Sequence, residues 1–352
     1  MIGALLAAGL LLAAPAAAPA AVSCGQTITQ NTTLEADLNC SETPGIVIGA
    51  PGITLDLGGH SVYSGSVSIL NHGYDDVTIE NGSVEVNTVG IRLQGVHGNV
   101  VRHIDLSGLQ NGIELTDSDA NRIVANRLAS VWIRLQGGSD DNVVRGNTVL
   151  GSESFISVAG SNGNRVVGNI MSAAEGAAVG LYQSNHTLVA NNDIRAVLGG
   201  GVSLIQSHDN RVSDNVVHAR ASGSNPVDVY GVEVTDSHAN LLARNHFFDT
   251  TTAIHVVSGW ANELRRNEAL GGLEDGFLID ATTVATKLLS NYVQNFGDDG
   301  IDVRASSSRL GSNTANANGA LGIRAVAGVT DLGGNQASGN GDPAQCVNVV
   351  CN

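Results

Sequence analysis

The stretch NRIVANRLASVWIRLQGGSDDNVVRGN, residues 121–147, begins and ends with the same motif: an asparagine, four residues and a second asparagine. Further copies occur along the chain, and the second asparagine falls at positions 126, 147, 169, 191, 215, 245, 267, 291, 313 and 335. The steps between them stay close to about 22 residues, and such self-similarity indicates a chain built from stacked structural repeats. One step, from Asn215 to Asn245, is clearly longer than the others.

Between the asparagine motifs, a small residue precedes alternating apolar positions, as in GIEL (112–115), GVEV (231–234) and GIDV (300–303). Alternation with a period of two indicates a strand with one buried face, and no segment shows a sustained helical period. A period of about 22 residues with two or three short strands and no helix predicts a β-solenoid. We expect the asparagines of successive coils to stack into ladders and to adopt the left-handed conformations that corners need.

This pattern resembles the right-handed parallel β-helix repeat family of the pectate-lyase-like superfamily, with its N-x-I-x-x-N and G-I-x-L repeats. The resemblance covers about residues 45–340. It implies a single all-β, right-handed parallel β-helix of roughly a dozen coils of about 22 residues. The family includes polysaccharide lyases, hydrolases and epimerases, phage tailspikes and periplasmic proteins of copper-enzyme assembly. Because this fold supports many activities, the resemblance identifies no specific enzyme family.

The two ends of the chain differ from the repeats. Residues 1–21 form an uncharged Ala/Leu block, which predicts a signal peptide, whereas a membrane anchor fits less well because Pro15 and Pro19 interrupt the block. An even cysteine count in an exported chain predicts disulfides, with Cys24 and Cys40 in a cap over 22–44 and Cys346 and Cys351 in a cap over 341–352. We therefore predict a secreted protein, extracellular or periplasmic, that is a monomer without a membrane span.

The composition restricts the partners. The formal net charge is −16, so the surface as a whole should repel nucleic acid and anionic membranes. An anionic substrate would need a bridging cation or a local basic patch. Aromatic residues make up only 3% of the chain, which leaves few side chains to stack on sugar rings. No tight histidine or methionine cluster is present, so soft-metal binding has little support.

The outward position of each G-I-x-L strand should form one stripe along the solenoid. Its residues are Arg92, Glu114, Arg134, Ser157, Ser203, Glu233, His255, Leu278, Asp302 and Arg324. In resembling lyases and hydrolases, the active site lies on such a stripe and its flanking turns. The alternative is a solvated face that needs only to be polar, and the alternating Arg and Glu residues at its start fit that alternative.

Acidic residues gather at the far end of the stripe. Asp275 precedes one strand, Asp298 and Asp299 precede the next strand one repeat later, and Asp302 lies within that strand. A single lysine, Lys287, lies in this interval. Stacked carboxylates repel one another, and Ca²⁺ relieves this because it prefers hard oxygen ligands. These four aspartates are therefore a candidate calcium site, and the alternative is an acidic turn that leads into a strand.

The longest step between asparagine motifs contains an inserted stretch, HARASGSNPVDVYG (218–231). Insertions in solenoids leave as loops on one face, which is often the binding face. We expect this loop to wall a groove whose floor carries Glu233 and His255. The candidate groove residues are Arg220, Tyr230 and Asp280. Trp260 is a further aromatic side chain for stacking on a sugar.

Two classes of function remain open. The first is binding or processing of an extracellular polysaccharide; the resemblance to pectate lyases implies calcium-assisted elimination, with His255, Arg304 or Glu233 as catalytic candidates. A glycoside hydrolase is less favoured because the N-T-D, G-H-G and R-I-K motifs of resembling polygalacturonases are absent. The second class is a non-catalytic surface or periplasmic scaffold that binds a cell-surface partner. The sequence leaves open whether the protein is an enzyme.

Overall fold

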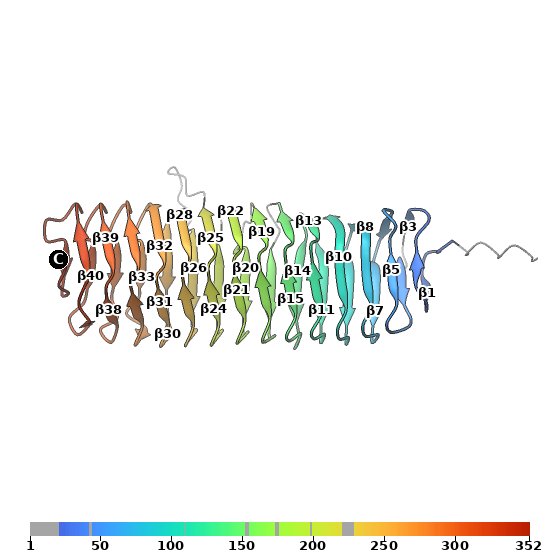
Figure 1. Cartoon of the computed structure of the whole chain (residues 1–352), viewed down its shortest axis with the longest axis horizontal. Helices are drawn as coiled ribbons and strands as arrows, with labels where there is room; N and C mark the ends of the chain where they lie inside the picture. The colour runs from blue at the N-terminus through green and yellow to red at the C-terminus, as the bar shows by residue number, and fades with distance from the viewer. Residues whose placement is uncertain are drawn as a thin grey trace, which may run out of the picture.

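The structure, a computed structural model, describes residues 21–41, 44–108, 110–151, 155–172, 176–197, 199–219 and 229–352. The predicted signal peptide, apart from its last residue, lies outside this part of the chain. All regular elements in the described part are strands, and they stack along one axis, with the N-terminal coils at one end and the C-terminal coils at the other (Figure 1). The prediction of an all-β solenoid is confirmed.

The first sheet contains one strand from each coil, fifteen in all, which indicates slightly more coils than the predicted dozen. Its strands are β1 (Gln26–Ile28), β4 (Ile46–Ile48), β7 (Val67–His72), β9 (Val89–Gln94), β11 (Asn111–Thr116), β14 (Trp132–Gln136), β17 (Ile156–Ala159), β20 (Val179–Tyr182), β23 (Val202–Ile205), β26 (Tyr230–Thr235), β29 (Thr252–Val256), β33 (Phe277–Ile279), β37 (Ile301–Val303), β40 (Ile323–Ala325) and β43 (Cys346–Val347). Neighbouring strands pair in parallel, coil upon coil.

Two further faces complete each coil. The second sheet contains β2 (Thr32–Thr33), β5 (Thr54–Asp56), β8 (Thr78–Val86), β10 (Val100–Gly108), β12 (Arg122–Val124), β15 (Val143–Arg145), β18 (Arg165–Val167), β21 (Leu188–Ala190), β24 (Arg211–Ser213), β27 (Leu241–Ala243), β31 (Glu263–Arg265), β35 (Lys287–Leu289), β38 (Arg309–Gly311) and β41 (Thr330–Asp331). The long strands β8 and β10 continue into the third sheet, which they share.

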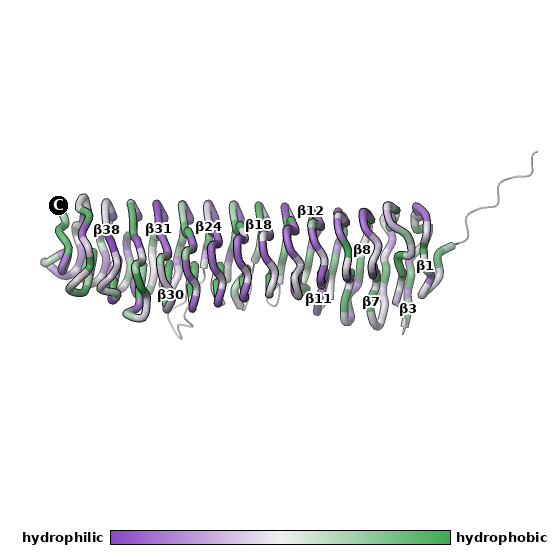
Figure 2. The backbone as a smooth tube through the Cα atoms, turned by 90° about the horizontal axis from the view of Figure 1, so that it is seen from below, coloured by the Kyte–Doolittle hydropathy of each residue, from purple (hydrophilic) through white to green (hydrophobic). Residues whose placement is uncertain are grey.

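The remaining strands of the third sheet are β3 (Leu38–Cys40), β6 (Ser61–Ser64), β13 (Arg127–Ala129), β16 (Thr148–Leu150), β19 (Ile170–Ser172), β22 (Asp193–Val197), β25 (Val216–Ala219), β28 (His246–Thr250), β32 (Glu268–Gly272), β36 (Tyr292–Gln294), β39 (Thr314–Asn316) and β42 (Gln336–Ser338). A separate pair, β30 (Gly259–Trp260) and β34 (Thr283–Val284), lies beyond the first sheet at a corner. Figure 2 shows the hydrophobic and hydrophilic residues alternating around each coil.

The apolar positions of all three sheets point into one continuous core. In β11, Ile113 and Leu115 are fully buried while Glu114 between them faces outward, and the same alternation recurs on successive coils. Burial of a Val, Leu or Ile side chain contributes about 1.5–3 kcal/mol relative to leaving it exposed. Because a coil buries its apolar face only against its neighbours, the stack is stable as a whole rather than coil by coil.

Asparagine ladders form at two corners, as predicted. At the second corner, the side-chain amide of Asn126 donates to Oδ1 of Asn147 at 3.1 Å, and the ladder continues through each coil to Asn335. One position in the sequence pattern was wrong: Asn169 donates to Asn192, not to Asn191. The repeat HTLVAN is shifted by one residue, because Thr187 occupies the position of the first asparagine and donates its backbone N–H to Asn210.

The left-handed corner positions differ from the expectation. The ladder asparagines do not occupy them; the residue before each second asparagine does, with positive φ at Ala125, Asn191, Asp214, Arg244 and Arg266, among others. The ladder asparagines instead use their amides to satisfy backbone groups of the coils on either side. Asn126, for example, accepts the backbone N–H of Ile104 and donates to the backbone carbonyl of Val101.

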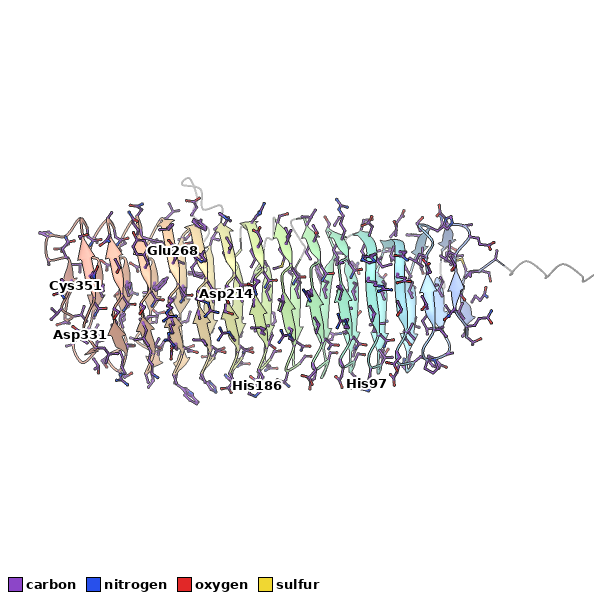
Figure 3. The ribbon with its side chains drawn as sticks, viewed as in Figure 1. His97, His186, Asp214, Glu268, Asp331 and Cys351 are labelled. Carbon is purple, nitrogen blue, oxygen red and sulfur yellow. A yellow bond between two sulfur atoms is a disulfide. The ribbon has the colours of Figure 1, made fainter. Side chains whose placement is uncertain are left out.

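Disulfides close both ends of the described chain. Cys24 is bonded to Cys40 and Cys346 to Cys351, which confirms the predicted local pairing. Cys351 lies at the C-terminal end of the stack (Figure 3). Local bridges of this kind restrain the terminal coils, which have a neighbour on one side only. Within the described residues, no helix is long and apolar enough to cross a membrane.

Candidate functional site

The predicted outer stripe exists in register on the first sheet. Glu233 pairs with His255, His255 with Leu278, Leu278 with Asp302, and Asp302 with Arg324. The N-terminal half is continuous as well, from Arg92 through Glu114 and Arg134 to Ser157. The sequence pattern missed one member, Gly180, which lies between Ser157 and Ser203 and removes a side chain from the middle of the stripe.

Much of the stripe is buried, which a merely solvated face would not be. Glu114, Ser157, Ser203 and Asp302 are each less than a tenth exposed although they point away from the core. Neighbouring side chains therefore shield these four residues from solvent, whereas Arg324 at the end of the stripe is exposed.

The predicted acidic cluster is assembled by two adjacent coils. Oxygen atoms of Asp275, Asp298 and Asp299 lie within 4.8 Å of one another. The backbone N–H of Asp299 donates to Oδ1 of Asp275 at 3.0 Å, so the turn before β37 is fastened to the turn before β33. Asp302 is not part of this group of three, and lies beside it on the floor of β37.

Two arginines offset the negative charge of the acidic cluster. The sequence of residues 274–302, which contains a single lysine, did not suggest this. Arg304 donates to Asp302 at 2.8 Å, and its other nitrogens lie 3.8 Å from Asp275 and 3.6 Å from Asp280. Arg324, from the next coil, forms an ion pair with Asp299. Lys287 lies on β35 in the second sheet, where it pairs with Glu263 and Arg309 in register.

The charge compensation is incomplete at Asp275. Burial raises the pKa of Asp275 to about 7, and the charges of Asp302, Asp298 and Asp299 act in the same direction, while the backbone N–H of Asp299 acts against them. Burial also raises the pKa of Asp302 despite its bond to Arg304. One oxygen of Asp302, Oδ1, is buried without a hydrogen-bond partner. Buried polar atoms of this kind are uncommon, and they often mark sites that bind something.

The carboxylates offer a partial calcium ligand set. Asp298 is exposed, and Oδ2 of Asp275 lies 3.8 Å from Arg304, whereas Oδ1 of Asp302 is unpartnered but buried and lies outside the group of three. Asp299 is committed, because Oδ1 accepts the backbone N–H of Leu321 at 2.8 Å and Oδ2 accepts from Arg324. Since Ca²⁺ takes about 6–8 oxygens, a polyanionic ligand or water would have to complete the set. The residues present fit a weak cation site.

The catalytic candidates are connected to the cluster through Asp280. Nε2 of His255 lies 3.1 Å from Oδ2 of Asp280, whose other oxygen faces Arg304. A histidine that donates Nε2–H to a carboxylate keeps its lone pair on Nδ1. Nδ1 of His255 is buried and has no hydrogen-bond partner, and the ring of Tyr230 lies 5.0 Å from the imidazole ring, centroid to centroid. The arrangement orients His255 as a base or as a hydrogen-bond acceptor.

Arg304 is the weaker base candidate. Partial burial lowers its pKa, but the hydrogen bond to Asp302 and the neighbouring carboxylates outweigh this, and the net pKa lies above the ordinary value. A guanidinium in this environment stays protonated. The structure thus makes Arg304 the residue that holds Asp275, Asp280 and Asp302 together.

A cavity of about 150 Å³ lies on the stripe over β20, β23 and β26, one coil before His255. Tyr182 and Tyr230 contribute its aromatic surface, and Ser203 and Glu233 its polar atoms. Tyr182 is 40% exposed. The sequence analysis did not identify it, because it is simply the last residue of a regular repeat strand. In register, Tyr182 aligns with Ile205 and then with Thr235, at the far end of β26 from Tyr230, but its ring lies back over Gly180, where no side chain stands in the way.

Two sequence candidates are not part of this site as described. Arg220 lies outside the described residues, as do most of the residues inserted after β25. Trp260 lies at the corner beyond the first sheet, where its ring stacks on His238 with a centroid distance of 4.2 Å. His238 stacks in turn on His208. The described aromatic side chains at the groove are therefore tyrosines.

Two family models match the chain. One is described as periplasmic copper-binding protein (NosD) and matches residues 53–225, and the other is described as right handed beta helix region and matches residues 177–342. Together they cover nearly all of the coils. No curated protein sequence matches the chain.

Several solved structures share the fold. A double mutant of the periplasmic alginate epimerase AlgG has a TM-score of 0.52 at 12% identity, over 80% of this chain and 77% of the epimerase. DFA-IIIase from Arthrobacter chlorophenolicus A6 without its lid has a TM-score of 0.53 at 14% identity, over 73% and 70%. The tailspike of E. coli bacteriophage HK620, in complex with a pentasaccharide, has a TM-score of 0.53 at 13% identity, over 92% and 68%. At these identities the likeness concerns the fold.

Proposed function

The chain belongs to the right-handed parallel β-helix repeat proteins, and on that premise we propose that it binds an extracellular polysaccharide in the groove over β20, β23, β26 and β29. The observation that carries the proposal is the cavity lined by Tyr182, Tyr230 and Glu233, because Tyr230 and Glu233 both neighbour His255 of the next coil. Tyrosine rings beside polar groups suit a sugar, which presents both apolar faces and hydroxyl groups.

Similar structures support a carbohydrate partner. The epimerase is named for alginate, and the tailspike was solved with a bound pentasaccharide. Periplasmic relatives and two disulfides favour an extracellular or periplasmic location, because disulfides persist in oxidising compartments.

The finer proposal is calcium-assisted elimination on an acidic polysaccharide. His255, oriented by Asp280, would take the proton from the ring carbon that bears the sugar carboxylate. A carbon–carbon double bond would form as the glycosidic C–O bond at the neighbouring carbon breaks, and the leaving oxygen would take a proton from water. Asp275, Asp298 and Asp302 would hold the cation, which when bound would neutralise that carboxylate. Arg304 keeps the aspartates in place, and Glu233 borders the cavity as a second polar contact.

Binding is tested with polysaccharides immobilised in affinity gels, using the wild type, Tyr230→Ala and the matched control Trp260→Ala. Tyr230 lies in the groove and Trp260 at the corner outside it, so the proposal expects retardation to be lost in Tyr230→Ala alone. If every neutral and acidic polysaccharide retards all three proteins equally, the groove is not the binding site.

Elimination is tested separately, by ultraviolet absorbance of unsaturated uronate products with the wild type and His255→Gln. Product formation that His255→Gln abolishes supports the lyase proposal. Retardation without product would favour the second candidate function, a non-catalytic scaffold. That candidate has one observation in its favour: Arg304 forms ion pairs with Asp275 and Asp302, two of the carboxylates that a catalytic cation would use.

A further inference from the structure

A second charged surface lies on the second sheet, away from the groove. We define the arginine face as residues 211–214, 241–244, 263–266, 287–290 and 309–312, which are the strands β24, β27, β31, β35 and β38 with the corner residue after each. These five strands stack in register on consecutive coils. In Figure 2, the labelled strands β24, β31 and β38 lie in one row along the solenoid.

The arginine face is basic although the protein is acidic. It carries Arg211, Arg244, Arg265, Arg266, Lys287 and Arg309 against two carboxylates, Asp214 and Glu263. The chain as a whole has a formal net charge of −16. Each of the five coils presents at least one cation here, so positive charges recur about every 4.8 Å along the axis.

Four of these arginines surround a cavity of about 160 Å³. Its lining residues are Arg211, Leu241, Ala243, Arg244, Arg265 and Arg266. Arg244 forms a two-pronged ion pair with Asp214, which is labelled in Figure 3, at 2.6 and 2.7 Å. Arg265 lies 4.0 Å from Glu263, at the limit of an ion pair. Among the described residues, Arg211 and Arg266 form no ion pair. The hydrogen bond from Arg244 lowers the pKa of Asp214, and the charge of Arg211 helps to lower it further.

The backbone places two of these arginines at equivalent positions. Arg244 and Arg266 occupy the left-handed corner position on adjacent coils, with φ of 55° and 53°. Other coils place Gly146, Gly168 and Asn191 there, but also Ala125, Ser290 and Ser312, so the corner accepts many residue types. The two arginines therefore stack through the repeat itself, and their positive charges lie on neighbouring coils.

We propose that the arginine face binds a linear acidic polysaccharide, with one sugar carboxylate in the cavity and further carboxylates along the cations of β35 and β38. Guanidinium groups bind carboxylates in paired hydrogen bonds, and a polyuronate repeats its charge at about the spacing of the coils. The five segments contain no aromatic residue, and single-stranded nucleic acid is normally held by stacking on aromatic rings. A polyuronate is therefore the favoured polyanion. This site does not depend on the groove over the first sheet.

The test measures binding of a fluorescein-labelled oligogalacturonate of about six sugars, long enough to follow five coils, by fluorescence anisotropy at low and at physiological ionic strength. The variant is Arg244→Asn/Arg266→Asn, because asparagine already occupies the left-handed corner at Asn191, so we expect the variant to keep the fold. The control is Arg127→Gln/Arg195→Gln, which removes two exposed arginines from the third sheet and changes the net charge equally. A groove variant, Tyr230→Ala/His255→Gln, separates the two surfaces.

We expect the arginine-face variant to weaken binding about tenfold and to reduce its salt dependence. The control and the groove variant should retain a binding component of wild-type strength. Equal losses in the arginine-face variant and in the control would overturn the proposal, since the binding would then follow net charge alone. Loss only in the groove variant would assign all binding to the groove and also overturn it. Tighter binding of a labelled thymidine oligonucleotide would show that the partner class is wrong.

Discussion

The two halves of the outer stripe, each taken with its flanking turns, differ in how their charges are satisfied. In the N-terminal half, Arg92 donates to Glu114 at 3.2 Å, and Gln136 donates to the other oxygen of Glu114 at 2.9 Å. In the C-terminal half, Asp275 keeps its proton up to about pH 7 and Asp302 has an oxygen without a partner. Where each carboxylate of the stripe has a hydrogen-bond or ion-pair partner, the charges stabilise the solenoid. Where a carboxylate lacks such a partner, it can bind a ligand.

The largest expected effect is a pH dependence of stability that comes from Asp275. Its folded pKa of about 7 lies above the ordinary value of 3.8. A raised carboxyl pKa contributes stability that is complete below about pH 4 and is lost as the pH rises through 7; the raised pKa of Asp302 acts in the same direction. For three pH units the loss is at most about 4 kcal/mol. Urea unfolding of the wild type and Asp275→Asn between pH 4 and pH 8 measures it.

In Asp275→Asn, Oδ1 can still accept the backbone N–H of Asp299, so the variant tests the charge rather than the turn. Its stability should vary less with pH than that of the wild type, and it should be the more stable protein at pH 8. A wild type whose stability rises between pH 5 and pH 8 would contradict the assignment.

The second effect concerns the arginine of each half. Arg304→Gln leaves Asp275, Asp280 and Asp302 without the arginine that they share. We expect the free energy of unfolding to fall by about 2 kcal/mol at pH 8, which is less than for a fully buried ion pair because half of the side chain is exposed. Arg92→Gln removes one partly exposed ion pair and should cost less than about 1 kcal/mol. Both are measured by urea unfolding at pH 8. Equal losses in the two variants would mean that the halves do not differ as described.

The third effect is calcium binding, which the C-terminal half alone should show. Calorimetry with the wild type at pH 8 should give a dissociation constant in the weak, about millimolar range typical of sparse extracellular sites. Affinity should fall as the pH is lowered through 7, because Asp275 must lose its proton to become a ligand. Asp298→Asn should weaken binding with little change in stability, since Asp298 is exposed. Heat of binding that is identical in Asp298→Asn would exclude this residue as a ligand.

Much of the fold was predictable because a solenoid converts sequence period directly into spatial neighbours. The alternation in GIEL and GIDV identified the buried and outward positions, and the recurring asparagine identified the corners. The error at Asn191 and Asn192 shows the limit of that interpretation. The repeat pattern alone cannot tell which of two adjacent asparagines belongs to the ladder, and only the hydrogen bond from Asn169 identifies Asn192 as the ladder residue.

The candidate site was predictable in its position and not in its chemistry. The outward stripe and the acidic turns followed from counting residues along the repeat. The ion pairs did not, because whether Arg304 turns toward Asp280, Asp302 or solvent depends on side-chain geometry that no period encodes. Burial of Asp275 depends in the same way on how tightly two turns pack, and this burial raises its pKa.

The amino-acid sequence by itself thus determined the repeat, the coil register, the two disulfides and the stripe on which a ligand could lie, since each depends on spacing along the chain. Only the tertiary structure decided which charges are satisfied and which are not. It showed that Nδ1 of His255 has no hydrogen-bond partner, that tyrosines line a cavity on the first sheet, and that several arginines lie close together on the second sheet. Satisfaction of a charged group depends on small differences in distance and on exclusion of water, and these arise only when the coils pack.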